Sequence, residues 1–194
     1  MQVIVYFLGI AGLILAIKKN RYSDRVIAAI LSFFWLWMGI VYHLMFFSDI
    51  NKVARVFGML FIAQGVLFLA AGVITTRISF RFKSNVYSFV GIIFILYAMI
   101  VYPIIGYLLG HGYPRSPGFG IAPCPTTIFT LGLLLWTDKR VPKYLLFIPL
   151  IWSLIGFYAA IALSIKEDIG LLIAGLAGTL LVLIREKKIA KENP

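Results

Sequence analysis

The segment HGYPRSPGFGIAPCPTTIFTLG, residues 111–132, contains four of the eight prolines of the chain and its only cysteine. Proline has no backbone N–H, and it disfavours helical geometry at the residue before it. The first half of the segment therefore cannot form a regular helix. Mostly apolar residues follow up to Trp136, so we expect a helix to begin near Pro125, because proline suits the first helical position. Cys124 would then lie near the N-cap.

This expected helix is short. From Pro125 to Trp136 there are 12 residues, which span about 18 Å at about 1.5 Å each, whereas the hydrocarbon core of a bilayer is about 30 Å thick. If Trp136 lies at the inner interface, the extended run from Phe119 to Pro123 must cross the remaining depth. Irregular backbone at that depth is tolerated where it is buried in protein or lines a cavity. The segment predicts a half-helix below a pocket that opens to the outside.

The composition of the chain is that of a membrane protein. Of its 194 residues, 62% are apolar and 13% are charged, against about 45–50% and about 25% in an ordinary soluble domain. Seven apolar segments could cross a bilayer, the first, fifth and last being short: 2–17, 26–47, 53–75, 86–109, 121–137, 143–163 and 169–184. No soluble domain fits between them. We therefore predict one all-α transmembrane domain, residues 1–194, with seven transmembrane helices.

The basic residues predict the orientation. Fourteen of the 18 lysines and arginines fall in every second connection or in the C-terminal tail. They are Lys18, Lys19, Arg21, Arg25, Arg77, Arg81, Lys83, Lys139, Arg140, Lys143, Arg185, Lys187, Lys188 and Lys191. Cytoplasmic loops are enriched in such residues, so we expect the N-terminus outside and the C-terminus in the cytoplasm. The net charge of +11 then indicates contact with anionic lipid at the cytoplasmic face rather than with nucleic acid.

The outer half of the expected bundle gathers the candidate ligand residues. They are Cys124, Thr126, Thr127, Pro123, Pro125, His111, His43, Arg115, Tyr113 and Gln64. A helix N-terminus has free N–H groups and a partial positive charge, which suit an anion, and transporters use broken helices in this way. Copper or zinc at His43, His111 and Cys124 is a weaker alternative, because no regular spacing links these ligands.

Each candidate also has a simpler structural interpretation. His43 fits a histidine at the membrane interface, and His111 and Arg115 fit solvated loop residues. Cys124 fits a small packed side chain as well as a reactive thiol. Gln64 fits an interhelical hydrogen bond near the middle of its span, beside the glycine stripe at 58, 65 and 72 that predicts close helix packing.

The core motif APCPTTIFT, Ala122–Thr130, within GFGIAPCPTTIFTLG, resembles a family of small prokaryotic multi-pass membrane proteins known only as a domain of unknown function. The likeness covers most of the chain. It supports residues 123–127 as the site. It carries no activity and no cofactor. From the apolar segments and the basic connections we expect an integral multi-pass protein of the plasma (inner) membrane.

Three classes of function fit these features. The first is a protein that binds or transports a small solute or ion entering from outside. The second is a structural or accessory subunit in which the Pro/Gly segment is a rigid plug. The third is an outer-leaflet enzyme with Cys124 as nucleophile or metal ligand and a histidine as base. A homo-oligomer is compatible with each class. The chain has no HExxH, GxSxG or P-loop motif, which disfavours an enzyme. No acidic residue lies within an expected span, which disfavours a proton-coupled pump.

Overall fold

The computed structural model describes residues 1–110, 118–163 and 165–192. Its helical residues form seven rods. The rods are α1 (Gln2–Ile17); α2 (Ser23–Trp37) with η1 (Met38–Phe47) and α3 (Ser48–Ile50); α4 (Ala54–Phe68) with η2 (Leu69–Ile74); α5 (Val86–Leu96) with η3 (Tyr97–Val101) and α6 (Tyr102–Leu108); α7 (Pro123–Leu134); α8 (Tyr144–Leu163); and η4 (Lys166–Asp168) with α9 (Ile169–Ile173), η5 (Ala174–Gly178) and α10 (Thr179–Glu192). Each rod begins and ends within three residues of its expected range, except that the last one continues to Glu192.

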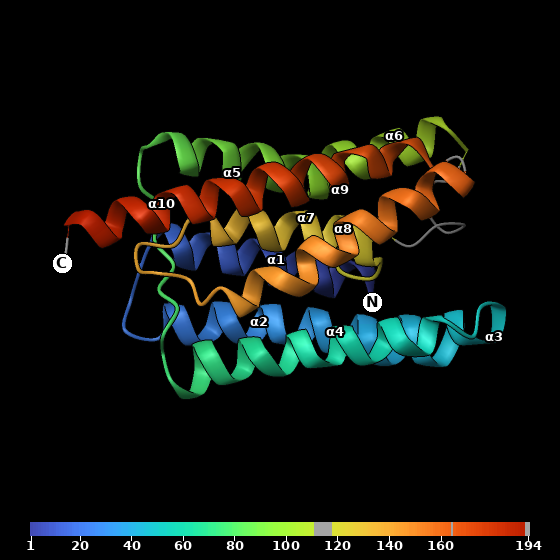
Figure 1. Ribbon diagram of the computed structural model, residues 1–194, viewed down its shortest axis with the longest axis horizontal. Coiled ribbons are helices and arrows are strands. Elements are labelled where there is room, and N and C mark those ends of the chain that lie inside the picture. Colours follow the sequence, from blue (N-terminus) through green and yellow to red (C-terminus); the bar gives the residue numbers. More distant parts are fainter. Residues whose placement is uncertain (111–117, 164, 193–194) are drawn as a thin grey trace.

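The chain is an all-helical membrane protein. Within the described residues, five helices are long and apolar enough to cross a membrane: Ser23–Ile50, Ala54–Ile74, Val86–Leu108, Tyr144–Ala162 and Lys166–Ala190. The helices Gln2–Ile17 and Pro123–Leu134 are apolar but shorter. Successive rods run in opposite directions, so the two chain termini lie towards opposite ends of the bundle (Figure 1).

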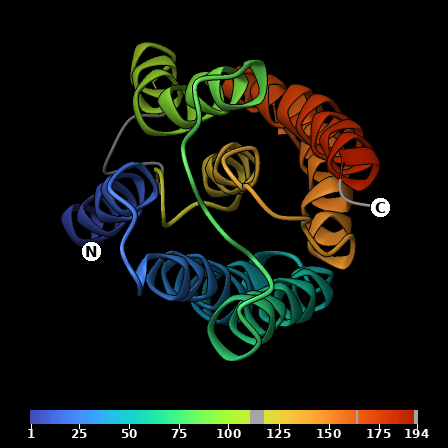
Figure 2. The ribbon, with the colours of Figure 1, turned by 90° about the vertical axis from the view of Figure 1, so that its left-hand side faces the viewer.

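The short helix α7 occupies the centre of the bundle. The other rods surround it when the molecule is viewed along its long axis (Figure 2), and it contacts α2, α5, α8, α9 and η5. Every residue from Pro125 to Thr137 is buried. A helix that is apolar on all sides must be covered either by protein or by lipid. The side chains of α7 are apolar apart from small hydroxyl groups, and here the other rods cover it.

Small residues permit the close packing of these rods, as expected in lipid. The predicted glycine stripe of the third rod faces α2: a Cβ atom on Gly72 would lie 2.1 Å from the Cβ atom of Ala28. The backbones of α5 and α7 also approach closely, because a Cβ atom on Gly91 would lie 2.7 Å from the carbonyl oxygen of Gly132.

The basic connections meet at one end of the bundle, on the left in Figure 1. Lys19 forms ion pairs with Asp24 at 3.1 Å and with Asp138 at 3.9 Å, and Arg81 pairs with Asp138 at 3.6 Å. The connection between η2 and α5 runs across this end of the bundle beside α7 (Figure 2). The backbone N–H of Arg81 in this connection donates to the carbonyl oxygen of Trp136 at 2.6 Å. These contacts close this end of the bundle.

Arg185 of α10 satisfies the C-terminal end of α7. Its guanidinium donates to the carbonyl oxygens of Leu134 at 3.1 Å and Leu135 at 2.9 Å, and it also donates to the hydroxyl of Thr137. The last carbonyl groups of a helix have no partners within the helix. In a buried helix such as α7 they must be satisfied by other parts of the protein.

Candidate functional site

Helix α7 begins two residues earlier than the sequence suggests. Its first residue is Pro123 and its N-cap is Ala122, so Cys124 is the second residue of the helix, close to the N-cap as expected. Both prolines fit in this turn because the first N–H groups of a helix have no intrahelical acceptor, and their loss there breaks no hydrogen bond.

The residues before α7 form a compact turn, and the expected extended run from Phe119 to Pro123 is wrong. The N–H groups of Ile121 and Ala122 both donate to the carbonyl oxygen of Gly118, at 3.1 and 2.8 Å. Gly120 makes this turn accessible, because its φ of +77° is a conformation that glycine adopts without strain. The chain therefore folds over the end of α7 within a few residues.

The hydroxyl of Thr126 holds this turn to the helix. It accepts a hydrogen bond from the N–H of Gly120 at 2.9 Å and donates to the carbonyl oxygen of Ala122 at 2.8 Å. Because of these two hydrogen bonds, Thr126 has a structural role in the turn.

The side chain of Phe119 also anchors the turn. It is fully buried and packs edge-on against Tyr6 and Phe129, with ring centroids 5.3 and 4.8 Å apart.

The first turn of α7 is a poor cradle for an anion. Pro123 and Pro125 have no N–H, and the N–H of Ala122 donates to the carbonyl oxygen of Gly118. Among the first three residues of α7, only Cys124 has an N–H. Because anion sites at helix N-termini depend on several converging N–H groups, the local geometry favours a different kind of ligand.

A cluster of polar side chains surrounds Cys124. Its thiol interacts with the carboxylate of Asp168 and lies next to the indole of Trp152. The hydroxyl of Tyr102 donates to Asp168 at 2.7 Å. We call Tyr102, Cys124, Trp152 and Asp168 the Asp168 cluster. Its members come from α6, α7, α8 and η4. Asp168, which is 5% exposed, interacts with Tyr102 and Cys124 and so links three rods, and Trp152 adds a fourth rod beside the thiol.

The position of Asp168 corrects the expectation that no acid lies within a span. The last rod begins at Lys166 and not at 169, and the span Lys166–Ala190 includes Glu167 and Asp168, both buried. The hydroxyl of Tyr97 donates to the backbone oxygen of Glu167 at 2.6 Å, which holds the first turn of the last rod in place. The ring of Tyr97 can reach that oxygen because Gly170 has no side chain: a Cβ atom there would lie 2.3 Å from the ring.

His43 lies next to the Asp168 cluster and is fully buried. Its imidazole is 5.2 Å from the indole of Trp152, centroid to centroid. Further rings around it belong to Tyr42, Phe47, Phe57 and Phe61. Neither ring nitrogen has a hydrogen-bond partner in the described part of the chain. A buried polar group without a partner is destabilising and rare, so the two ring nitrogens are available as hydrogen-bonding groups for a ligand.

A model of the family of unknown function DUF6064 matches residues 1–193. The chain belongs to this family. The match confirms the resemblance seen at APCPTTIFT and extends over every rod of the bundle, so the Asp168 cluster lies inside the DUF6064 region. No curated protein matches the chain, and no solved structure matches it.

The other predicted site residues of this DUF6064 protein have different surroundings. The amide of Gln64 donates to the backbone oxygen of Leu145 at 3.0 Å, which is the interhelical bond considered as its simpler interpretation. The hydroxyl of Thr127 is buried and has no partner among the described residues. Thr127 follows Cys124 by three residues and so lies on a neighbouring part of the helix surface. His111, Tyr113 and Arg115 lie outside the described residues.

The structure tests the metal hypothesis only in part. Within residues 1–110, 118–163 and 165–192, no three or more His, Cys, Asp or Glu side chains are grouped closely enough to hold a metal ion. The expected set of His43, His111 and Cys124 includes one residue outside this region. Copper or zinc binding therefore stays a prediction, as does the outward pocket, which would border residues 111–117.

In this DUF6064 chain, sequence reasoning missed three members of the cluster: Tyr102, Trp152 and Asp168. Asp168 had a signal in the sequence, because the pair Glu167–Asp168 directly precedes an apolar segment, and such a segment can extend into a preceding turn. Tyr102 and Trp152 had none, since aromatic residues are common in every span.

Proposed function

We propose that this DUF6064 protein binds a small solute or ion at the Asp168 cluster and that a cation or a solute with a cationic group is favoured. The observation that carries the proposal is the buried carboxylate of Asp168. It accepts from Tyr102 and interacts with Cys124, and no lysine or arginine in the described residues forms an ion pair with it. Ionisable groups inside a membrane protein are costly, and they mark ion and substrate paths.

We further propose how the bundle lies in the plasma membrane. All seven rods cross it, α7 as a half-helix, with the N-terminus outside and the basic end in the cytoplasm. Five long apolar helices and the contacts that unite the basic connections support this arrangement through the positive-inside rule. The Asp168 cluster then lies in the outer half, and the ion network of Lys19, Arg81 and Asp138 closes the inner end.

Alkylation of Cys124 tests the proposal. Cells that contain the protein are treated with a membrane-impermeant maleimide, with choline chloride replaced stepwise by NaCl, KCl or MgCl₂. We expect labelling from outside and at least one of the three cations to slow it. Asp168→Asn should remove this protection, whereas Asp49→Asn should retain it, because Asp49 is an exposed acid in α3.

Two outcomes would contradict the proposal. Equal protection in Asp168→Asn and the parent would mean that the cation acts elsewhere. Labelling only after denaturation would favour the second candidate, a structural or accessory subunit. That candidate is supported by the burial of every residue of α7 except the half-buried Cys124, and by the hydrogen bonds at both its ends.

A further inference from the structure

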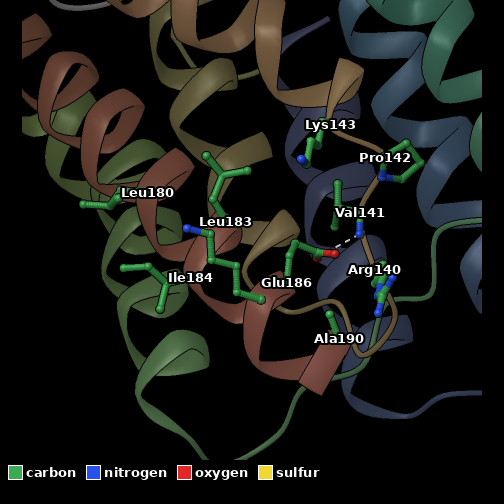
Figure 3. Close-up of a pocket in the computed structure, with 10 residues that line it drawn as sticks. Arg140, Val141, Pro142, Lys143, Leu180, Leu183, Ile184, Glu186 and Ala190 are labelled. Atoms are coloured by element: carbon green, nitrogen blue, oxygen red, sulfur yellow. Dashed lines mark hydrogen bonds between the residues drawn. The ribbon is translucent and has the colours of Figure 1, made fainter. Parts of the chain in front are cut away.

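A groove lies at the basic end of the bundle, far from the Asp168 cluster. It has a volume of about 590 Å³ and lies between α10 and the connection from α7 to α8 (Figure 3). The residues that line it are Arg140, Val141, Pro142, Lys143, Leu180, Leu183, Ile184, Glu186, Lys187 and Ala190.

One carboxylate lines the groove, and its interactions lie within the protein. Glu186 is 8% exposed. It accepts a hydrogen bond from the N–H of Val141 at 2.9 Å, drawn as the dashed line in Figure 3, and it pairs with Arg185 at 3.4 Å. These contacts fix the connection against α10. Because Arg185 balances its charge, the groove is left with the positive charge of its exposed residues.

Three exposed cations lie on the groove, namely Arg140, Lys143 and Lys187. They come from both of its sides, the first two from the connection and the third from α10. None of them forms an ion pair with another described residue. Their charges are thus available to an anion placed between the two sides.

An apolar wall adjoins these cations. Leu180 and Ile184 are 58% and 46% exposed, and they lie four residues apart on one face of α10. Both belong to the apolar span Lys166–Ala190. Along α10 the wall is followed by Lys187, so the surface changes from apolar to basic at the end of the span. This order matches the order of acyl chain and headgroup in a lipid leaflet.

We propose that this groove binds one anionic phospholipid, with its phosphate between Arg140, Lys143 and Lys187 and an acyl chain along Leu180 and Ile184. Basic pockets beside membrane helices bind anionic headgroups in this way. The charge complementarity selects an anionic headgroup over a zwitterionic one, and the apolar wall selects a lipid over a free phosphate. The inference rests on the membrane character of the helices and is independent of the solute site at Asp168.

Native mass spectrometry of the full chain in detergent tests the proposal. The protein is incubated with dioleoylphosphatidylglycerol, with dioleoylphosphatidylcholine, which has the same acyl chains, or with glycerol 3-phosphate, which has no acyl chain. We expect one retained phosphatidylglycerol with an affinity at least about ten-fold above that of phosphatidylcholine, since each basic residue near an anionic lipid contributes about five-fold. Glycerol 3-phosphate should not be retained.

A matched pair of variants locates the site. Arg140→Gln, Lys143→Gln and Lys187→Gln together should reduce the affinity for phosphatidylglycerol to that for phosphatidylcholine. The control removes three exposed cations elsewhere, Lys18→Gln, Arg77→Gln and Lys83→Gln, and should retain the lipid. Equal loss in both triple variants would show diffuse attraction and overturn the proposal. Equal affinity for the two lipids in the parent would also overturn it, whether or not the variants fold.

Discussion

The hydroxyl of Tyr102 donates a hydrogen bond of 2.7 Å to the carboxylate of Asp168, which joins α6 to the start of the last rod. Both groups are buried, at 8% and 5% exposure. The carboxylate also interacts with Cys124 of the central helix. One acid therefore links three rods at the same end of the bundle, and its removal should affect both stability and binding.

Tyr102→Phe removes one donor to Asp168 and leaves the ring in place. A hydrogen bond to a charged group contributes about 1.5–3 kcal/mol, so we expect a lower midpoint of thermal unfolding in detergent. The control is Tyr107→Phe, because Tyr107 lies on the same helix with 73% of its surface exposed. Equal midpoints for the two variants would show that the bond to Asp168 contributes nothing to the fold.

His43→Phe should separate stability from ligand binding. The change removes two buried ring nitrogens that have no partner in the described residues and places a phenyl ring in an aromatic environment. Relief of an unsatisfied polar group is worth about 1–3 kcal/mol, so thermal stability should rise. Cation protection of Cys124 should weaken if His43 contributes to the site. His43→Gln is the polar control, and a lower stability of His43→Phe than of His43→Gln would contradict this interpretation.

Arg185→Gln should strongly destabilise the fold. It leaves the carbonyl oxygens of Leu134 and Leu135 without their donor and Glu186 without its cation. Breaking a buried ion pair by removing one partner costs about 3–5 kcal/mol. The measurement is the urea or thermal unfolding midpoint, with exposed Lys188→Gln as control. Arg185→Lys should rescue only part of the loss, because an ammonium cannot reproduce the fork of a guanidinium. Full rescue by lysine would argue against the fork geometry.

Gly72→Ala should push α2 and η2 apart, because the new Cβ atom would lie 2.1 Å from that of Ala28. Overpacking of this kind costs about 1–3 kcal/mol. The control is Gly12→Ala, where the nearest atom is the end of the Ile30 side chain at 3.8 Å. The double variant Gly72→Ala with Ala28→Gly should recover the thermal midpoint. A failure to recover it would place the loss in something other than this contact.

The positions of the rods could be predicted from the sequence because they depend on the hydropathy and length of single segments. An apolar run of sufficient length forms a helix in lipid because its backbone groups must be satisfied within the segment, so 86–109 and 53–75 agree closely with the observed helices. The glycine stripe predicted close packing for the same reason: a missing side chain leaves room for whatever neighbour is present. The resemblance at APCPTTIFT pointed to the correct kind of family.

The start of α7 was less predictable. Two prolines two residues apart fit the same first turn, so their positions alone could not distinguish a helix beginning at Pro125 from one beginning at Pro123. The turn before it depends on Gly120 and on the hydroxyl of Thr126. That hydroxyl could equally have served a ligand, and only its two hydrogen bonds show its role in the turn.

Hydropathy and the distribution of charge along the chain were thus enough to establish the helical membrane class and to group the basic connections, because both properties act locally in sequence. The tertiary structure alone placed α7 at the centre, brought Arg185 to its C-terminal end and assembled Tyr102, Cys124, Trp152 and Asp168 from four rods. The physical reason is that an apolar helix surface is about equally stable against lipid and against another helix. Which rods meet is therefore decided by close packing and by the pairing of a few buried polar groups, and neither is encoded in the periodicity of a single segment.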